Sequence, residues 1–196
     1  MPSKLIELED GVLVEIDKLK TISRRNYIAD GSRTENDAEH SWTFAMAALL
    51  LHEAVVEPID LLKVLKMALI HDIVEVDVGD TFIYDEAAKV GQAEREQRAA
   101  ERLFGALPAD QGADLLALWR EFEEYGTPEA RYARAIDRVS ALILNLASSG
   151  RAWREHGVTC DRVLAINKRI ADSAPALWDH VRALIENAAQ NGVFNR

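Results

Sequence analysis

The sequence predicts an all-α protein, folded as one compact helical bundle whose central helices surround a buried polar site. Apolar residues recur at helical spacing along nearly the whole chain. No segment shows convincing strand alternation, because the alternating run Val74–Val78 is short and continues a helical pattern. The length of 196 residues suits one domain with a sizeable core, and no repeat or long linker divides it. We therefore expect a single domain over residues 1–196.

Two of the expected helices have distinctive sequences. Thr127, Pro128 and Glu129 have the order of a helix cap, a first-turn proline and a first-turn acid. The segment Asn36–His52 is apolar nearly all round, so this helix should be central and buried, whereas the charged segment Glu86–Leu103 should be largely exposed. In chain order, the expected helices are one marked by Val12, Ile16 and Leu19, and then Asn36–His52, Pro58–Gly79, Glu86–Leu103, Pro108–Glu124, Thr127–Ala147, Asp161–Ala171 and Ala174–Gln190.

Charge and cysteine content limit the class of protein. The formal net charge of −10 disfavours a long nucleic-acid partner, but a local metal and a few arginines would still attract a small anionic substrate. The single cysteine, Cys160, cannot form an intrachain disulfide. The N-terminus turns acidic at once, unlike a signal peptide, and no apolar run approaches the ~18 residues that span a bilayer. We expect a cytoplasmic protein without a membrane partner.

The pair His71 and Asp72 interrupts an otherwise apolar helical run, Val64–Glu75. Burying an imidazole and a carboxylate is costly unless each is paired or bound to a cation. A divalent metal would stabilise both residues at once. If the pair binds a metal, further ligands should lie elsewhere in the chain.

Two further candidates lie on other expected helices. His40 is in the first turns of the helix after Asn36, and Asp137 has a small, apolar helical neighbourhood. Taken alone, a lone buried histidine is more often structural, and Arg134 or Arg138 would make Asp137 part of an ion pair. Together, two imidazoles and two carboxylates form a mixed donor set that suits Mn, Co, Fe, Ni, Zn or Mg. The sequence predicts that His40, His71, Asp72 and Asp137 bind one such ion.

Other polar residues near this set have open roles. Glu75 follows His71 by four residues, so on a continuous helix it shares that face and could accept a proton from a metal-bound water or hydrogen-bond a ligand histidine. Asp80 follows Gly79, where the helix is expected to end. It could belong to the site, or it could be an ordinary turn residue. The remaining histidines are expected to be structural or exposed: His52, His156 and His180.

These residues resemble the H…HD…D signature of the HD-domain superfamily of metal-dependent phosphohydrolases. The resemblance is closer to the HD-domain 5′-deoxynucleotidases, and it covers roughly residues 15–170. The segments that carry it are Arg33–Ser41, His71–Asp80 and Trp153–Gly157.

The resemblance implies hydrolysis of nucleoside 5′-monophosphates, preferably deoxy forms, by an all-helical homodimer. It implies that Glu75 and Asp80 act on the attacking water and the substrate. It also implies that Arg24 or Arg25, with Tyr27 where tryptophan is usual, contacts the nucleotide. Members with two or three metals have extra histidines after the HD pair, and this chain has none before His156, so we expect one metal. The alternatives are a non-catalytic nucleotide-binding module, a phosphatase for another metabolite, and core ion pairs without metal.

Overall fold

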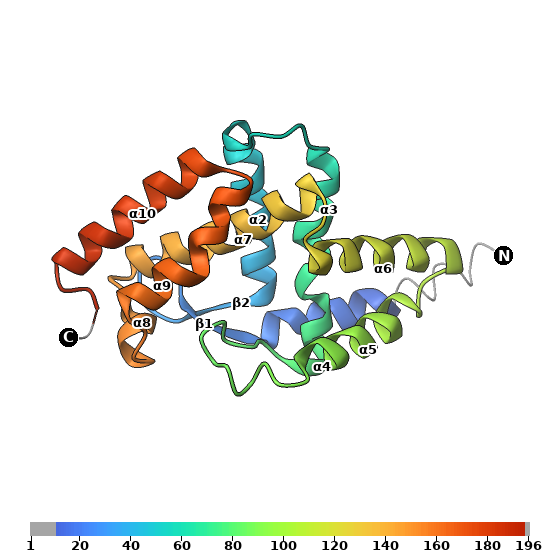
Figure 1. Ribbon diagram of the computed structural model, residues 1–196. Coiled ribbons are helices and arrows are strands. Elements are labelled where there is room, and N and C mark those ends of the chain that lie inside the picture. The colour runs from blue at the N-terminus through green and yellow to red at the C-terminus, as the bar shows by residue number, and fades with distance from the viewer. Residues whose placement is uncertain (1–10, 195–196) are drawn as a thin grey trace.

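The computed structural model describes residues 11–194 and confirms the all-α prediction. The residues that bear on a signal peptide lie outside this range. Helices form all of the regular structure described except one small hairpin (Figure 1). In chain order the elements are helical residues 11–17, η1 (Lys18–Thr21), β1 (Ser23–Tyr27), β2 (Thr34–Asn36), α2 (Asp37–Leu51), η2 (His52–Ala54), α3 (Leu61–Ile70), η3 (His71–Val74), α4 (Glu75–Val78), α5 (Gln92–Phe104), α6 (Ala109–Glu124), α7 (Pro128–Ala147), α8 (Arg151–Glu155), α9 (Cys160–Asn167), η4 (Lys168–Asp172) and α10 (Pro175–Gln190).

The centre of the fold is formed by α2, α3 and α7, which pack against one another. Their shared core contains the fully buried side chains of Phe44, Met67 and Ile136, one from each helix. The start of α2 is fixed by a capping box, in which the Asn36 side chain accepts from the Glu39 amide and the Glu39 side chain accepts from the Asn36 amide. This cap sets the position of the next residue, His40, at the buried end of α2.

Two further apolar clusters flank the central helices. Ile73 and Val74 pack with the C-terminal half of α5 and with Trp119 of α6. The second half of α7 packs against the region that contains α8, α9 and α10. In Figure 1, α5 and α6 extend to one side of the central helices, and α8, α9 and α10 lie on the other.

The prediction of a purely helical chain was wrong for residues Ser23–Tyr27 and Thr34–Asn36, which form an antiparallel hairpin. These strands are short and polar, so they lack the apolar alternation by which a strand is recognised in a sequence. Their alternation is nevertheless real, since Arg24 and Asn26 are turned inward while Ser23 and Arg25 are exposed.

The expected helix from Pro58 to Gly79 begins three residues later and changes its geometry at the His-Asp pair. Asp60 caps α3, which ends at Ile70. A 3₁₀ turn then covers His71–Val74. The short α4 follows and is terminated by Gly79, whose φ is +73°. A 3₁₀ turn within a helical stretch often marks a functional site. The expectation that Glu75 shares one helical face with His71 assumed a continuous α-helix. The 3₁₀ turn interrupts that helix between the two residues.

The prediction that the helix over Asn36–His52 is buried all round holds for one face only. On the other face, Trp42 is 66% and Leu50 is 75% exposed, and Met46 and Leu49 are partly exposed. An apolar composition does not reveal which faces of a helix have a partner within the chain. This apolar stripe of α2 therefore faces outward.

The remaining helix bounds differ modestly from those expected. The α5 helix begins at Gln92, because residues 86–91 form turns, and its buried Leu103 and Phe104 show that one face of its second half lies in the core. The segment predicted as Asp161–Ala171 is divided between α9 and η4, and the short α8 was not expected. No helix in residues 11–194 is long and apolar enough to cross a membrane.

Candidate metal centre

The two predicted ligand histidines lie side by side in the core, with ring centroids 5.4 Å apart. The His71 ring packs against Phe44 at 5.1 Å and Phe122 at 5.3 Å, and its Nδ1 lies 3.0 Å from the carbonyl oxygen of Ala68. Because a carbonyl only accepts, Nδ1 carries the proton and Nε2 of a neutral His71 presents a lone pair. The backbone contact thus orients His71 as a metal ligand is usually oriented.

His40 is oriented by a carboxylate on each side. Its Nδ1 lies 3.6 Å from Glu35 Oε2, and its Nε2 lies 2.9 Å from Asp137 Oδ1 on α7. Both His40 and Glu35 are almost completely buried. A carboxylate behind a histidine is a frequent partner of metal-binding imidazoles, because it fixes the ring and its tautomer. Glu35 was not identified from the sequence.

Asp72 joins the two histidines into one group. Its Oδ2 lies 3.0 Å from His71 Nε2 and 3.9 Å from His40 Nε2. Donor atoms of His40, His71 and Asp72 all lie within 4.8 Å of one another. Asp137 is attached to this group through its contact with His40. The structure therefore brings the four predicted ligands together from α2, η3 and α7.

These residues fit a divalent metal ion. His71 Nε2 is buried and has no hydrogen-bond partner among the described residues, which is costly for a core nitrogen unless it binds something else. Two ligands at ~2.1 Å from an ion and at right angles to each other are ~3.0 Å apart. The separations of 2.9 Å for His40–Asp137 and 3.0 Å for His71–Asp72 match this value. The mixed nitrogen and oxygen donors suit a borderline or hard divalent cation.

The site is negatively charged before any ion binds. Burial favours protonation of Asp72 and Asp137, but neighbouring positive charges outweigh it and hold the pKa of both carboxyls well below the usual range. Burial also opposes a charge on His40, yet its contacts with Asp137 and Glu35 raise the pKa of His40 to about 9. Without a metal, a proton on His40 thus supplies part of the positive charge that the neighbouring carboxylates favour.

A second group of acids lies beside the first. Carboxylate oxygens of Asp37, Glu75 and Asp80 lie within 4.8 Å of one another. Burial, then the negative charges of Asp72 and Asp37, raises the pKa of Glu75 to about 12. Burial likewise raises the pKa of Asp37 to about 6. Protonation of this pair of carboxyls is therefore favoured in the metal-free site. A nearby cation would lower both pKa values and favour loss of the proton.

Asp37 was not identified from the sequence. It lies at the start of α2, where an acid is ordinarily explained by the helix dipole. Its side chain is completely buried, and one of its oxygens has no hydrogen-bond partner among the described residues. The only sequence signal was its place three residues before His40, which puts the two residues on neighbouring turns of one helix.

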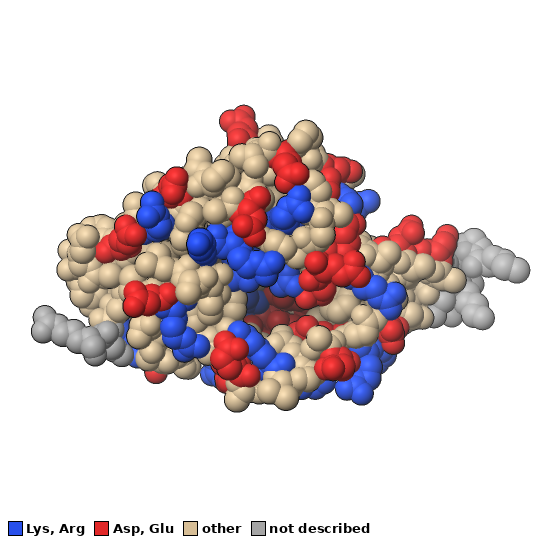
Figure 2. All heavy atoms as spheres, viewed as in Figure 1, with Lys and Arg blue, Asp and Glu red and all other residues tan. Residues whose placement is uncertain are grey.

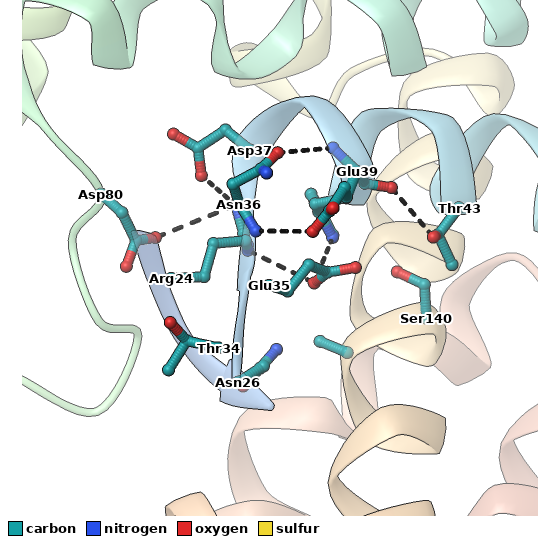
Figure 3. A network of polar contacts seen from close by, with 12 residues as sticks. Arg24, Asn26, Thr34, Glu35, Asn36, Asp37, Glu39, Thr43, Asp80 and Ser140 are labelled. Atoms are coloured by element: carbon teal, nitrogen blue, oxygen red, sulfur yellow. Dashed lines mark hydrogen bonds and ion pairs between the residues drawn. The ribbon is translucent and has the colours of Figure 1, made fainter. Parts of the chain in front are cut away.

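Arg24 is the cation that connects both groups. Its Nη1 lies 2.7 Å from Asp72 Oδ2, 3.3 Å from Asp37 Oδ1 and 3.8 Å from Asp80 Oδ1. Figure 3 shows this side chain reaching from the hairpin toward the carboxylates of Asp37, Asp80 and Glu35. Burial disfavours its charge, but the surrounding carboxylates outweigh burial and raise the pKa of Arg24 further. The structure thus distinguishes Arg24 from Arg25, which the sequence did not.

Arg25 and Tyr27 lie farther from the acids. Arg25 is exposed and lines the hollow beside the site. The Tyr27 hydroxyl lies 2.9 Å from Glu155 Oε2, and the guanidinium of Arg151 stacks 4.0 Å from the Tyr27 ring centroid. The structure therefore brings Arg24 to the metal ligands and leaves Tyr27 bound to α8.

Two hollows meet at this site. The larger, about 450 Å³, is lined by charged residues that include Glu96, Arg134 and Arg138, and it reaches Asp72 and Glu75. The smaller, about 90 Å³, extends from Asp80 and Asp137 along α7. Figure 2 shows a depression at the centre of this face, with acidic atoms in its depth and basic atoms along its edge. A small anion would therefore reach the metal ligands from solvent.

The buried His-Asp cluster of this helical bundle is open to a hollow with basic edges. The sequence model of the HD domain family matches residues 16–178, and the chain belongs to this family. The resemblance to the HD-domain superfamily seen in the sequence is thereby confirmed.

Known proteins agree with this placement. The chain is 29% identical over 132 residues to the "5′-deoxynucleotidase HDDC2" of Dictyostelium discoideum, covering 64% of this chain and 70% of that protein. It is 25% identical over 129 residues to the human protein of the same name, covering 65% and 62%. The chain therefore spans less than two thirds of the human relative.

Solved structures are similar over a greater length. The crystal structure of a "predicted metal-dependent phosphohydrolase" from Magnetospirillum magnetotacticum superposes with a TM-score of 0.94 and 45% identity, covering 100% of this chain and 98% of that one. The PH0347 protein of Pyrococcus horikoshii shares the fold, with a TM-score of 0.67 and 22% identity over 89% of this chain and 98% of that one.

Proposed function

We propose that this protein removes the 5′-phosphate from deoxynucleoside monophosphates. The observation that carries the proposal is the grouping of the four-residue donor set with Glu75, Asp80 and Arg24 at one hollow. Relatives named 5′-deoxynucleotidases support the substrate class. The substrate in this proposal is a small anion, and we propose that the whole chain acts as one cytoplasmic HD domain.

One divalent ion per chain would be held by His40, His71, Asp72 and Asp137. When bound, such an ion lowers the pKa of a coordinated water and offsets negative charge on the phosphate. Mn, Co, Fe, Ni, Zn and Mg all suit the donor set. Glu35 and the Ala68 carbonyl would keep His40 and His71 in the tautomers that leave Nε2 free.

Glu75 is our candidate for the proton acceptor. It belongs to the acidic group that includes Asp80, and both residues line the larger hollow next to Asp72. Positive charge at the neighbouring ligands would favour the ionised form of Glu75, which then orients or deprotonates the attacking water. Asp37, which has a carboxylate oxygen within 4.8 Å of one of Glu75, would receive or share that proton.

Arg24, Arg25 and Asp80 are our candidates for holding the substrate. Arginine forks suit phosphate oxygens, and Arg24 already reaches the ligand carboxylate of Asp72. Asp80 faces Arg24 and would act on the water or the leaving oxygen. Contact between Tyr27 and the substrate stays a prediction, and it requires the hydrogen bond from Tyr27 to Glu155 to open.

We also propose that the protein is a homodimer and that its interface includes the outward apolar stripe of α2. Trp42, Met46, Leu49 and Leu50 recur at i, i+4, i+7 and i+8 on one face of that helix. An exposed apolar stripe of this kind is typical of a protein–protein contact.

The test is phosphate release from a panel of deoxynucleoside and ribonucleoside 5′-monophosphates with added Mn or Co. We expect turnover that a chelator abolishes and that Glu75→Gln lowers by at least about 100-fold, the range of general-base removal. Arg182→Gln, at an exposed position of α10 that lines neither hollow, is the control. Metal-dependent nucleotide binding without release from any monophosphate would instead indicate a non-catalytic binding module. Release only from other phosphorylated metabolites would contradict the nucleotide assignment.

A further inference from the structure

We infer that the buried amides of Asn145 and Asn26 form a recognition site for a hydroxyl group on the alcohol half of the substrate. In a deoxynucleotide this group is the sugar 3′-hydroxyl. The inference rests on the proposed function, because it specifies which substrate feature that same site selects. It arises from the smaller of the two hollows at the metal centre.

This hollow has both charged and uncharged lining residues. The charged ones are Arg24, Arg25, Asp80, Asp137 and Arg138. Asn26, Asn145 and Trp153 belong to the uncharged part of the wall, together with apolar residues of α7. Asn145 follows Asp137 by eight residues on α7, which is ~12 Å along the helix axis. The volume of about 90 Å³ is well above the ~10–15 Å³ that a single water molecule requires.

The orientation of both amides follows from one backbone group. Asn145 Nδ2 lies 3.0 Å from the carbonyl oxygen of Ala141 and 2.9 Å from Asn26 Oδ1. The Ala141 carbonyl only accepts hydrogen bonds, so the nitrogen of the Asn145 amide must face it. That nitrogen in turn requires the oxygen of Asn26. Flipping Asn145 would place two acceptors against each other, and flipping Asn26 would place two donors against each other.

This arrangement leaves one acceptor without a partner. Asn145 is only 4% exposed, and its Oδ1 is buried without a hydrogen bond among the described residues. An unpaired buried amide oxygen destabilises a fold, and Asn145 is one of the residues that line the hollow, so we take this oxygen as the acceptor for a ligand group that donates to it. Since Asn26 Oδ1 is already used, the free side of the Asn26 amide offers N–H donors. A hydroxyl meets both requirements, because it donates to Asn145 and accepts from Asn26.

The charged hollow on the other side of the metal centre is a poorer place for the alcohol half. Its wall includes Lys89, Glu96, Glu123 and Arg134, which favour water or charged groups. The smaller hollow is also lined by charged residues, among them Arg25 and Arg138, but its wall includes Ala141, Leu142 and Trp153, which favour a neutral sugar that buries some carbon. A phosphate between the hollows would therefore direct its ester carbon toward Asn145.

The test measures two substrates with two forms of the protein. Hydrolysis of a 2′-deoxynucleoside 5′-monophosphate is compared with that of the matching 2′,3′-dideoxy compound, for the wild type and for Asn145→Ala. We expect the wild type to prefer the hydroxylated substrate by about tenfold in kcat/KM, as one or two hydrogen bonds provide. Asn145→Ala should lower that preference to within about twofold, by slowing only the hydroxylated substrate. Calorimetric binding of the two corresponding nucleosides should show the same loss of preference.

Asn167→Ala is the matched control, and Asn26→Ala is the second test variant. Asn167 lines the same hollow and makes the same bond to the carbonyl four residues earlier, but neither of its polar atoms is unpaired. Its replacement should affect both substrates equally. If Asn145→Ala does not fold, Asn26→Ala on the hairpin should lose the same preference.

Three results would overturn the inference. One is equal hydrolysis of both substrates by the wild type. Another is an equal decrease for both substrates in Asn145→Ala, which would assign Asn145 a structural or water-binding role. The third is a change in base preference with an unchanged hydroxyl preference. Each differs from failure of the proposed function, in which the wild type hydrolyses no nucleotide at all.

Discussion

The guanidinium of Arg24 lies 2.7 Å from the carboxylate of Asp72, so a strand cation contacts a predicted metal ligand directly. The same side chain approaches Asp37 and Asp80. Arg24 thus offsets charge in a site whose acids would otherwise repel one another. Its position couples the stability of the metal-free protein to the affinity for metal and to the binding of substrate.

Arg24→Gln should destabilise the metal-free protein and strengthen metal binding. Removing one partner of a buried ion pair costs about 3–5 kcal/mol, because the other charges stay buried. The same loss of a competing cation should lower the Kd for Mn, while kcat/KM falls because phosphate loses a contact. Denaturant unfolding in chelator and calorimetric titration with Mn measure the two effects. Arg25→Gln is the control, and an equal change in both variants would contradict a special role for Arg24.

Glu75→Gln should stabilise the chelated protein, and more so at pH 8 than at pH 5. Burial beside Asp72 raises the pKa of Glu75 to about 12, whereas in the unfolded chain it ionises near 4.5. The resulting stability is present below pH 4.5 and is progressively lost as pH rises toward 12. Glutamine does not titrate, so the gain at pH 8 should exceed about 1 kcal/mol, or about 2–4 °C in Tm. Thermal melts in chelator check this, and a gain independent of pH would refute the pKa assignment.

Metal binding should strengthen as pH rises from about 6 to 9. Contacts with Asp137 and Glu35 raise the pKa of His40 to about 9, so the metal must displace a proton below that pH. In the metal-free protein, the stability from protonated His40 is complete below about 6.5 and is lost as pH rises through 9. The difference in Tm between loaded and chelated protein should therefore widen over this range. A constant difference would show that His40 does not bind the ion.

Leu50→Glu should shift the protein from dimer to monomer without loss of fold. Leu50 is 75% exposed in one chain, so a charge there is tolerated by the monomer but not by an apolar interface. Sedimentation velocity gives the mass of the species in solution. Leu69→Glu, at an exposed position on α3, is the control. Monomeric wild-type protein would disprove the proposed interface.

The sequence predicted the helices, and the grouping of the four candidate metal ligands, for identifiable reasons. The α7 helix has apolar periodicity and a clear N-terminal cap at Thr127, and α6 begins directly after Pro108, so the bounds of both differ from prediction by at most one residue. His71 and Asp72 were conspicuous because charged groups rarely interrupt an apolar run without a partner. Such signals are local, and a single sequence displays them.

The rest of the site depends on long-range packing. Arg24 and Asn26 are brought inward by a hairpin whose polar strands have no apolar pattern. Asn145 and Asn26 meet across 119 residues, and no local spacing indicates such a contact. Asp37 and Glu35 resembled ordinary acids near a helix start, and their burial arises only when α2 packs against its neighbours. Exposure of the α2 stripe likewise depends on which faces find a partner.

The central claim is that His40, His71, Asp72 and Asp137 bind one divalent ion. Elemental analysis of protein stripped by chelator, reloaded with Mn and desalted measures it most directly, in the wild type and in His71→Ala. We predict about one ion per wild-type chain and none in His71→Ala, with the variant still folded by circular dichroism. A wild type without metal, or a folded His71→Ala that keeps its full ion, would contradict the claim.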